Sequence, residues 1–380
     1  MCIAGDPSGD EHASHVISHI VKARPDIECF GVGGPKMQAA GFQTLMPFAP
    51  FNRMGLGEVL SGIAFFAHAR KTLAEEMARR RPDMLVAVDY AGFNIGMMKT
   101  ANRLGIPVLW YIAPKVWAWK KNRAQIIGKC AQYIACILPF EPRYFEGYGA
   151  RPLYVGNPCV EELLQSGSIG AGRRKGARRH NDRPWRIALV PGSRPQEIRR
   201  IFPSMAEAGA ILRSTYKAHV RVSTYAGLDK RLFSPCLQKY GLEGFAGPLI
   251  ELLAWADAAI VTSGTATLQA ALMGVPHVLV YNMSLINYIA FKCIIRFPYI
   301  GLPNIIARKE IIKECVQRNS KPGQLVAHVA RFLKEPEYYE TTKNELAALQ
   351  AVLGEKRPSE EVSRIILEHL SRENPSTQSI

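Results

Sequence analysis

Short runs of apolar residues, many of them β-branched, alternate along the chain with longer stretches in which apolar residues recur at helical spacing. The runs lie at residues 29–33, 84–88, 107–113, 133–138, 153–156, 186–191, 219–224, 258–262 and 276–281. Strands that alternate with helices in this way form βαβ units, and such units build parallel sheets. The pattern therefore predicts an α/β fold.

A polar, glycine-rich and strongly basic segment at 166–184 separates the first five runs from the last four. The segment has no apolar periodicity, which is typical of a linker or an exposed loop. The chain of 380 residues also exceeds the ~250–300 residues beyond which a single core usually splits. We therefore predict domains at 1–165 and 185–350. Ser359, followed by two glutamates, indicates a closing helix at about 355–372 that we expect to pack back on the first domain.

The beginning of the chain has no basic segment followed by a long apolar run, so we expect no secretion signal and a cytoplasmic location. Residues 1–4 are fewer than the ~5–6 residues of a typical strand, which suggests that the native start lies upstream of Met1. The most apolar window, 284–302, contains Lys292 and Arg296. It falls short of the ~18 uncharged residues that a spanning helix needs, so we expect no membrane span.

A formal net charge of +16 and a pI near 9.6 predict an anionic partner, which could be nucleic acid, a lipid surface or an anionic substrate. The sequence has no zinc-finger spacing, no aromatic RNA-binding motif and no repeat, and this argues against nucleic acid. Its eight cysteines form no C-x-x-C pair. That argues against a zinc ribbon or a disulfide framework and fits a reducing compartment.

Three loops that each follow a predicted strand are candidates for ligand binding, because open parallel sheets bind ligands at the carboxyl ends of their strands. The first loop is glycine-rich and carries Asp6, Ser8, Gly9 and Asp10. It matches neither the dinucleotide fingerprint nor the P-loop. The alternative is a tight turn in which Ser8 or Asp10 caps the next helix.

The second loop contains Gly192, Ser193 and Arg194, between a predicted strand and a charged helix. Backbone N–H groups at a helix start, together with a planar guanidinium, suit a diphosphate. The alternative is a surface turn with a solvated arginine.

The third loop places five small residues between a predicted strand and an apolar helix: Ser263, Gly264, Thr265, Ala266 and Thr267. Glycine lets the backbone approach a phosphate, hydroxyls add donors, and the helix dipole favours negative charge. This loop is the strongest single indication of a nucleotide-diphosphate site in the chain. A plain capped helix is the alternative.

Asp89 ends the predicted strand 84–88, where a carboxylate with a raised pKa could take the proton of an attacking hydroxyl. The alternative is an aspartate that caps the next helix. The sequence contains no Asp-x-Asp pair, and carboxylate pairs of this kind are what a divalent cation on a sugar diphosphate needs. We therefore expect a reaction without metal or cofactor, in which helix N-termini and Arg194 meet the charge of the leaving group.

Taken in order, these motifs resemble the lipid-A-disaccharide synthases, a family of glycosyltransferases. The resemblance runs from about 4 to 320 and rests on AGDPSGD (4–10), GVGGPKMQAAGF (31–42), MGLGEVL (54–60), VDYAGFN (88–94), PKVWAWKKNR (114–123), LPFE (138–141), LVPGSR (189–194), SGTATL (263–268) and LPNIIA (302–307). It implies a GT-B fold, which consists of two Rossmann-like domains that face a cleft. It also implies the substrates UDP-2,3-diacylglucosamine and 2,3-diacylglucosamine 1-phosphate, joined at the 6-hydroxyl of the second with inversion and release of UDP.

The same resemblance implies roles for individual residues. Asp89 would be the general base, Arg194 would bind phosphate, and Asp6, where the family usually has glutamate, would sit near the acceptor. The further positions implied in substrate binding are Ser8, Gly9, Asp10, Gly192, Ser193, Ser263, Gly264, Thr265, Ala266, Thr267, Gln269, Asn304, Glu314 and Gln317.

Three positions depart from the family pattern. Gln269 stands where a glutamate associated with the ribose hydroxyls is common, and glutamine can still hydrogen-bond a diol without the strength of a charge. Asn157 replaces the histidine of the usual Gly-His-Pro, so no histidine role transfers there. Residues 90–92 replace Ala-Pro-Asp, which removes a carboxylate near Asp89 and keeps Asp89 itself.

Both implied substrates carry acyl chains, so the enzyme would meet the anionic inner-membrane surface peripherally. The candidate membrane or acyl contacts are Phe48, Phe51, Met54, Phe65 and Phe66, beside basic residues. A core helix and its preceding loop are the alternative for these side chains. The sequence leaves a homodimer open.

Two other hypotheses stay open at this point. One is a different enzyme of the same fold, such as a UDP-N-acetylglucosamine epimerase or a peptidoglycan glycosyltransferase, against which PKVWAWKKNR argues. The other is a binder of nucleic acid or anionic membrane without enzymatic activity, which the basic stretch 173–180 motivates.

Overall fold

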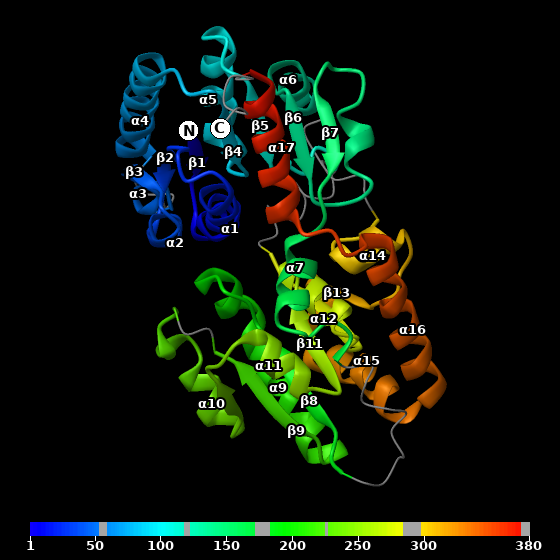
Figure 1. The fold of residues 1–380 in the computed structure, drawn as a ribbon. Coiled ribbons are helices and arrows are strands. Elements are labelled where there is room, and N and C mark those ends of the chain that lie inside the picture. Colours follow the sequence, from blue (N-terminus) through cyan, green and yellow to red (C-terminus); the bar gives the residue numbers. More distant parts are fainter. Residues whose placement is uncertain (53–58, 118–121, 172–182, 225–226, 284–297, 374–380) are drawn as a thin grey trace. The chain divides into compact units, whose positions relative to one another are not determined.

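The computed structural model in Figure 1 describes residues 1–52, 59–117, 122–171, 183–224, 227–283 and 298–373. The chain divides into two compact units, Met1–Pro158 with Lys356–Ile380 and Cys159–Glu355. Each unit has its own parallel sheet.

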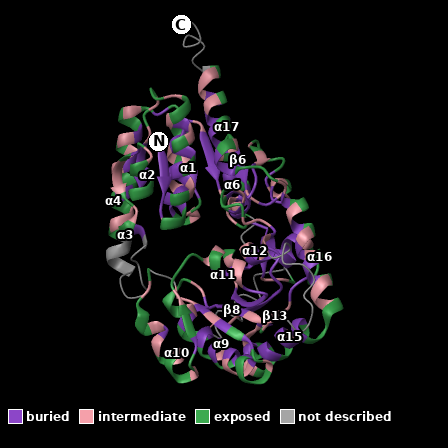
Figure 2. Cartoon of the chain, turned by 60° about the horizontal axis from the view of Figure 1, so that its bottom comes forward, coloured by how far each residue is buried: buried purple, intermediate pink, exposed green. Residues whose placement is uncertain are grey.

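The sheet of the N-terminal unit has seven strands in the order β3-β2-β1-β4-β5-β6-β7. Its inner strands consist of buried apolar residues, because helices cover both faces of the sheet; Figure 2 shows the buried residues gathered on the strands. The strands are β1 (Cys2–Ala4), β2 (Phe30–Gly33), β3 (Gln43–Pro47), β4 (Leu85–Val88), β5 (Val108–Tyr111), β6 (Tyr133–Cys136) and β7 (Arg151–Tyr154).

Two sets of helices enclose this sheet. One face is covered by α4 (Val59–Arg80), α5 (Ala91–Arg103) and α6 (Asn122–Cys130), the other by α1 (Pro7–Ala23), α2 (Pro35–Ala39) and α17 (Pro358–Glu373). The short helices α3 (Ala49–Asn52) and η1 (Pro142–Tyr144) complete the unit. Although α1 and α17 come from opposite ends of the chain, they pack side by side, and Ile17 shares a core with Ile365 (Figure 1).

The sheet of the C-terminal unit has six strands in the order β10-β9-β8-β11-β12-β13. They are β8 (Arg186–Val190), β9 (His219–Ser223), β10 (Glu243–Phe245), β11 (Ala258–Thr262), β12 (His277–Tyr281) and β13 (Glu314–Val316). The helices are α7 (Pro158–Gln165), α9 (Pro195–Tyr216), η2 (Lys230–Leu232), α10 (Ser234–Tyr240), α11 (Leu249–Trp255), α12 (Thr265–Leu272), α14 (Leu302–Ala307), η3 (Gln317–Ser320), α15 (Pro322–Lys334) and α16 (Pro336–Leu353). One core joins α9 and α15 to the sheet.

Both sheets are doubly wound, and their strand order reverses once. In the N-terminal unit the chain proceeds from β1 to one edge and returns to place β4 on the other side of β1; in the C-terminal unit β8 and β11 have the same relation. At such a switch point the loops after the two strands diverge and leave room for a ligand. The fold thus indicates one binding position in each unit.

Candidate functional site

The candidate residues gather at the two switch points. Asp6 follows β1 and Asp89 follows β4, whereas Gly192 to Arg194 follow β8 and Ser263 to Thr265 follow β11. In each pair the two strands are neighbours in a parallel sheet, so the loops that follow them start side by side at the carboxyl end of the sheet.

A strained turn presents Asp89 at the β1/β4 switch point. Asp89 and the next residue, Tyr90, have φ angles of 42° and 45°, which are uncommon for residues other than glycine and concentrate at functional sites. The buried amide of Asn94 supports the turn, because its Nδ2 donates to the carbonyl oxygens of Val88 (3.1 Å) and Asp89 (2.9 Å). The Tyr90 hydroxyl donates to the carbonyl oxygen of Phe51 at 2.9 Å.

The electrostatic surroundings of Asp89 suit a base. Asp89 is solvent-accessible, as a base that meets a substrate must be, and yet neighbouring protein atoms crowd its carboxyl. This partial desolvation and the charge of Asp6 raise the pKa of Asp89, while the charge of Lys115 opposes the rise. A carboxylate with a raised pKa accepts a proton more readily near neutral pH.

The first glycine-rich loop serves the structure in two ways. Asp6 caps α1, because its Oδ1 accepts from the Gly9 amide at 2.6 Å, so the cap is neither Ser8 nor Asp10. Asp10 is 2% exposed and caps α2, accepting from the amides of Gly34 (2.7 Å), Lys36 (3.1 Å) and Met37 (3.1 Å). Its carboxylate is thus engaged inside the protein. Ser8 is exposed, whereas Gly9 is buried in the first turn of α1.

At the β8/β11 switch point, Arg194 is the residue before α9, and its side chain is 78% exposed. Its Nη1 lies 3.2 Å from Glu197 Oε1, a surface pair of the kind that contributes little stability. Gly192 has φ +105°, and a Cβ atom there would lie 2.9 Å from Thr262 Cγ2 at the end of β11. Glycine therefore allows the two loops to approach, while Ser193 and Arg194 face solvent.

The start of α12 has the features of an anion site. Gly264 is exposed with φ +149°, a conformation that favours glycine, and Thr265 beside it is also exposed. The first N–H groups of a helix have no intrahelical acceptor and carry the positive end of the helix dipole. Thr267 is 0% exposed, and its hydroxyl donates to the carbonyl oxygen of Gly264 at 2.7 Å, so it shapes the turn from inside. Ser263 and Ala266 are half-buried.

Gln269, one turn further along α12, is held by a carboxylate. Its Nε2 donates to Glu162 Oε2 of α7 at 2.8 Å. Residues four apart on a helix share a face, so Gln269 lies on the same side of α12 as Thr265. The partner Glu162 could not be predicted from the sequence, because it lies more than 100 residues from Gln269 in the chain.

Asn304, Glu314 and Gln317 make internal contacts. Asn304 is 0% exposed; its Nδ2 donates to Glu314 Oε1 (2.8 Å), and its Oδ1 accepts from the Ile311 amide (2.8 Å). Glu314 also accepts from the Gly301 amide and so holds the start of α14. Gln317 bonds both backbone groups of Met283 after β12. In this conformation Asn304 shapes its loop and does not present its amide to a ligand.

The aromatic residues that we predict to contact a membrane differ in how far they are buried. Phe51 is 3% exposed and belongs to the core, with ring centroids 5.0 Å from Phe65 and 5.2 Å from Phe93. For Phe51 the alternative, a core position, is correct. Phe48, Phe65 and Phe66 are half-buried, and Met54 lies outside the described residues.

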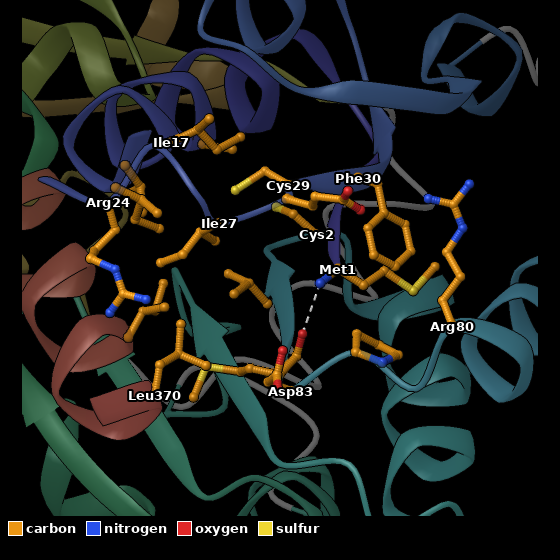
Figure 3. A pocket seen from close by; sticks show the side chains of 18 of the residues that line it. Met1, Cys2, Ile17, Arg24, Ile27, Cys29, Phe30, Arg80, Asp83 and Leu370 are labelled. Atoms are coloured by element: carbon orange, nitrogen blue, oxygen red, sulfur yellow. Dashed lines mark hydrogen bonds between the residues drawn. The ribbon is translucent and has the colours of Figure 1, made fainter. Parts of the chain in front are cut away.

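A cavity of about 760 Å³ lies in the N-terminal unit, between the sheet and the helices α1 and α17. Its lining includes Met1, Ile17 of α1 and Leu370 of α17 (Figure 3). The Met1 ammonium donates to the carbonyl oxygen of Met84, immediately before β4. The cavity thus includes the amino ends of β1 and β4 and extends along the sheet to Val88, and none of the candidate site residues lines it.

The comparisons with known proteins agree along the whole chain. Residues 1–366 match the family model described as lipid-A-disaccharide synthetase. The chain is 33% identical over 385 residues to the lipid-A-disaccharide synthase of Geobacter sulfurreducens, with 98% of this chain and 97% of the relative covered. It is 35% identical over 367 residues to the enzyme of that name from Anaeromyxobacter dehalogenans, with 93% of each covered.

Solved structures with lower identity share the fold. The UDP-N-acetylglucosamine 2-epimerase of Neisseria meningitidis, bound to UDP-GlcNAc, has a TM-score of 0.64 at 13% identity and covers 98% of this chain and 99% of its own. The calicheamicin glycosyltransferase CalG4 has a TM-score of 0.57 at 16% identity, with 98% and 97% covered. The likeness and the two doubly wound sheets confirm the predicted α/β fold of the GT-B class.

Proposed function

The chain belongs to the lipid-A-disaccharide synthase family, whose members are UDP-sugar glycosyltransferases of lipid A biosynthesis, and we propose a specific reaction for it. The donor is UDP-2,3-diacylglucosamine, and the acceptor is the 6-hydroxyl of 2,3-diacylglucosamine 1-phosphate. The hydroxyl oxygen bonds to the anomeric carbon as the bond from that carbon to the UDP oxygen breaks, with inversion. The hydroxyl proton passes to a carboxylate, and the electron pair leaves on UDP.

Asp89 carries this proposal. It is accessible, lies at the switch point of the N-terminal sheet, and has its pKa raised by partial desolvation and by Asp6. An ionised carboxylate of raised pKa can accept the hydroxyl proton of the acceptor. The charge of Asp6 is one cause of the raised pKa of Asp89. This supports a place for Asp6 at the acceptor as well.

The C-terminal unit supplies the features that a departing UDP requires. The exposed guanidinium of Arg194 and the first turn of α12, at Gly264 and Thr265, both lie at the β8/β11 switch point. A fixed helix N-terminus and an arginine can be aligned in advance with the charge that develops on the diphosphate. The Arg194 pair with Glu197 is weak enough to be exchanged for phosphate.

Peripheral association with the anionic inner membrane follows from the same proposal, because both substrates carry acyl chains. A net charge of +16 favours such a surface. The half-buried side chains of Phe48, Phe65 and Phe66 remain candidates for acyl contact. No helix in the described part of the chain is long and apolar enough to span a bilayer.

The direct test is to incubate the purified protein with both acylated sugars and to follow UDP release and disaccharide formation, with and without EDTA. We expect disaccharide and UDP in equal amounts under both conditions. Absence of UDP release from protein that circular dichroism shows to be folded would refute the proposed reaction. Loss of the product in EDTA alone would refute its metal independence.

A substitution at Gln269 tests the ribose side of the donor site. Gln269→Glu would place a second carboxylate against Glu162, beside the site for a diphosphate. We expect UDP affinity to fall about twofold, because a second negative charge here repels the diphosphate by more than a carboxylate gains at the ribose, and a like-charge repulsion of roughly 0.5 kcal/mol corresponds to that factor. The double variant Glu162→Gln with Gln269→Glu moves the charge and keeps the hydrogen bond, so it should recover the affinity in calorimetric titrations. An unchanged Kd in the single variant would place Gln269 outside the UDP site.

A further inference from the structure

A buried carboxylate that the proposed reaction does not use lies beyond the carboxyl end of β6. Glu141 is 1% exposed. Its Oε1 accepts from Trp117 Nε1 at 3.1 Å, and its Oε2 accepts from the amides of Ile137 (3.1 Å) and Leu138 (3.0 Å). Trp117 packs edge-on against Phe140, with ring centroids 5.3 Å apart. A buried carboxylate requires hydrogen bonds of this kind. Glu141 therefore holds Trp117 against the loop that follows β6.

The segment that Glu141 anchors follows β5 and extends from Ile112 to Trp117. It starts with strain, because Ile112 is β-branched and has φ +62°. Such a conformation persists only where surrounding contacts hold it. The hydrogen bond between Trp117 and Glu141 holds the far end of the segment.

Lys115, in the middle of this segment, acts on the candidate base. The segment starts beside the candidate base, because the Asp89 amide donates to the carbonyl oxygen of Tyr111 at 2.9 Å. The charge of Lys115 lowers the pKa of Asp89 and also that of Glu141. At Asp89 this charge opposes the rise caused by desolvation and by Asp6. The position of Lys115 therefore sets how much of this rise is offset.

We propose that Glu141 is a positioning residue, which holds Trp117 and thereby keeps the ammonium group of Lys115 beside Asp89. This inference rests on the proposed function for one element only, the role of Asp89 as the base. It assigns a task to two motifs, PKVWAWKKNR and LPFE, that the proposed reaction leaves without one.

The surroundings of Glu141 make the anchor sensitive to pH. Burial raises its pKa to about 7, against the hydrogen bonds and the charge of Lys115. Among the described residues, the charge of Glu141 in turn helps to raise the pKa of Cys136 of β6 and of Tyr154 of β7. Above this pKa the carboxylate accepts all three N–H groups. Below it the added proton turns one oxygen from acceptor to donor, so the hold on Trp117 weakens as the pH falls through about 7.

The test is a titration of the Asp89 carboxyl by NMR in wild type, Glu141→Gln, Lys115→Ala and the double variant. We expect Glu141→Gln to raise the pKa of Asp89, because Lys115 is no longer held beside it. Lys115→Ala should raise it as well, and the double variant should show no further change, since both act through one contact. For turnover, we expect the acid limb of the kcat profile of Glu141→Gln to move to higher pH together with the pKa of Asp89, with KM for the donor unchanged.

Glu76→Gln on α4 is the matched control, because it removes a glutamate that pairs with Arg79 and Arg80 on the surface. It should leave the titration and kcat unchanged. If Glu141→Gln does not fold, Trp117→Phe removes one hydrogen bond, keeps a ring against Phe140, and should raise the pKa of Asp89 in the same direction.

An Asp89 titration that is unaffected in folded Glu141→Gln would overturn the inference, and so would additive shifts in the double variant. The proposed function fails separately. If Asp89→Asn kept full turnover while the Asp89 titration still responded to Glu141→Gln, the base would be another residue and the positioning role of Glu141 would stand.

Discussion

Asparagine in place of Asp89 is expected to lower kcat by about 10²–10⁴-fold, the range that a general base contributes. The amide has nearly the shape of the carboxylate and cannot take the hydroxyl proton. Asp89 has φ 42°, and asparagine is one of the few residues that adopt this conformation readily, so the turn should survive. UDP release under saturating substrates measures the effect, and thermal unfolding checks the fold.

Asp83→Asn provides the matched control, because Asp83 lies just before β4 and Asp89 just after it. It should leave kcat unchanged. A full rate in Asp89→Asn would remove Asp89 from the mechanism, whatever the control showed.

The pH dependence of wild-type turnover checks the same assignment. A base works in its ionised form, so kcat should fall as the pH falls through the pKa of Asp89, which lies above its ordinary value of 3.8. Asp6 is one cause of that rise. The variant Asp6→Asn should therefore move the acid limb of the kcat profile to lower pH.

The inner strands could be predicted from the sequence, and the edge strands could not. The strands β2, β4, β5, β6, β8, β9, β11 and β12 lie within the nine apolar runs. The apolar runs do not include β3, β10 or β13, which are edge strands of the two sheets. An edge strand buries less of its surface, so its residues need not form an apolar run. The ninth run, at 153–156, overlaps β7 (Arg151–Tyr154), the fourth edge strand, and is shifted from it by two residues.

The position of the candidate site could be predicted in outline, because loops after parallel strands meet at one sheet edge. The contacts inside it could not. Asp10 and Asn304 belong to motifs that suggest ligand binding. Their side chains instead accept hydrogen bonds from backbone amides of other segments of the chain. Whether a carboxylate or amide faces inward depends on which loop packs against it, and no local pattern records that.

Lys115 and Glu141 show the reverse case, because each belongs to a family motif from which the sequence alone predicts no role for it. The charge of Lys115 lowers the pKa of Asp89, and Glu141 holds the same segment from a different loop. Their connection passes through Trp117, which sequence spacing alone cannot reveal, because 24 residues separate Trp117 from Glu141.

Alanine in place of Arg194 is expected to reduce kcat by about 10²–10³-fold, which is the loss seen when one preorganised donor to developing charge is removed. The leaving diphosphate gains charge in the transition state, so UDP affinity should fall less than kcat. The side chain is 78% exposed, and stability should therefore change by no more than about 0.5 kcal/mol. Turnover and UDP titration on the same preparation separate the two effects.

Two further variants decide what Arg194 contributes. Arg194→Lys keeps the charge and loses the planar fork, so it should recover only part of the rate if two phosphate oxygens are bound together. Arg199→Ala, at another exposed position near the start of α9, controls for the loss of one positive charge and should keep kcat. If Arg199→Ala and Arg194→Ala lost activity equally, the basic surface as a whole would attract the donor, and Arg194 would have no specific place at the diphosphate. If Arg194→Ala lost only UDP affinity and kept kcat, the arginine would bind ground state and transition state alike, which removes it from catalysis.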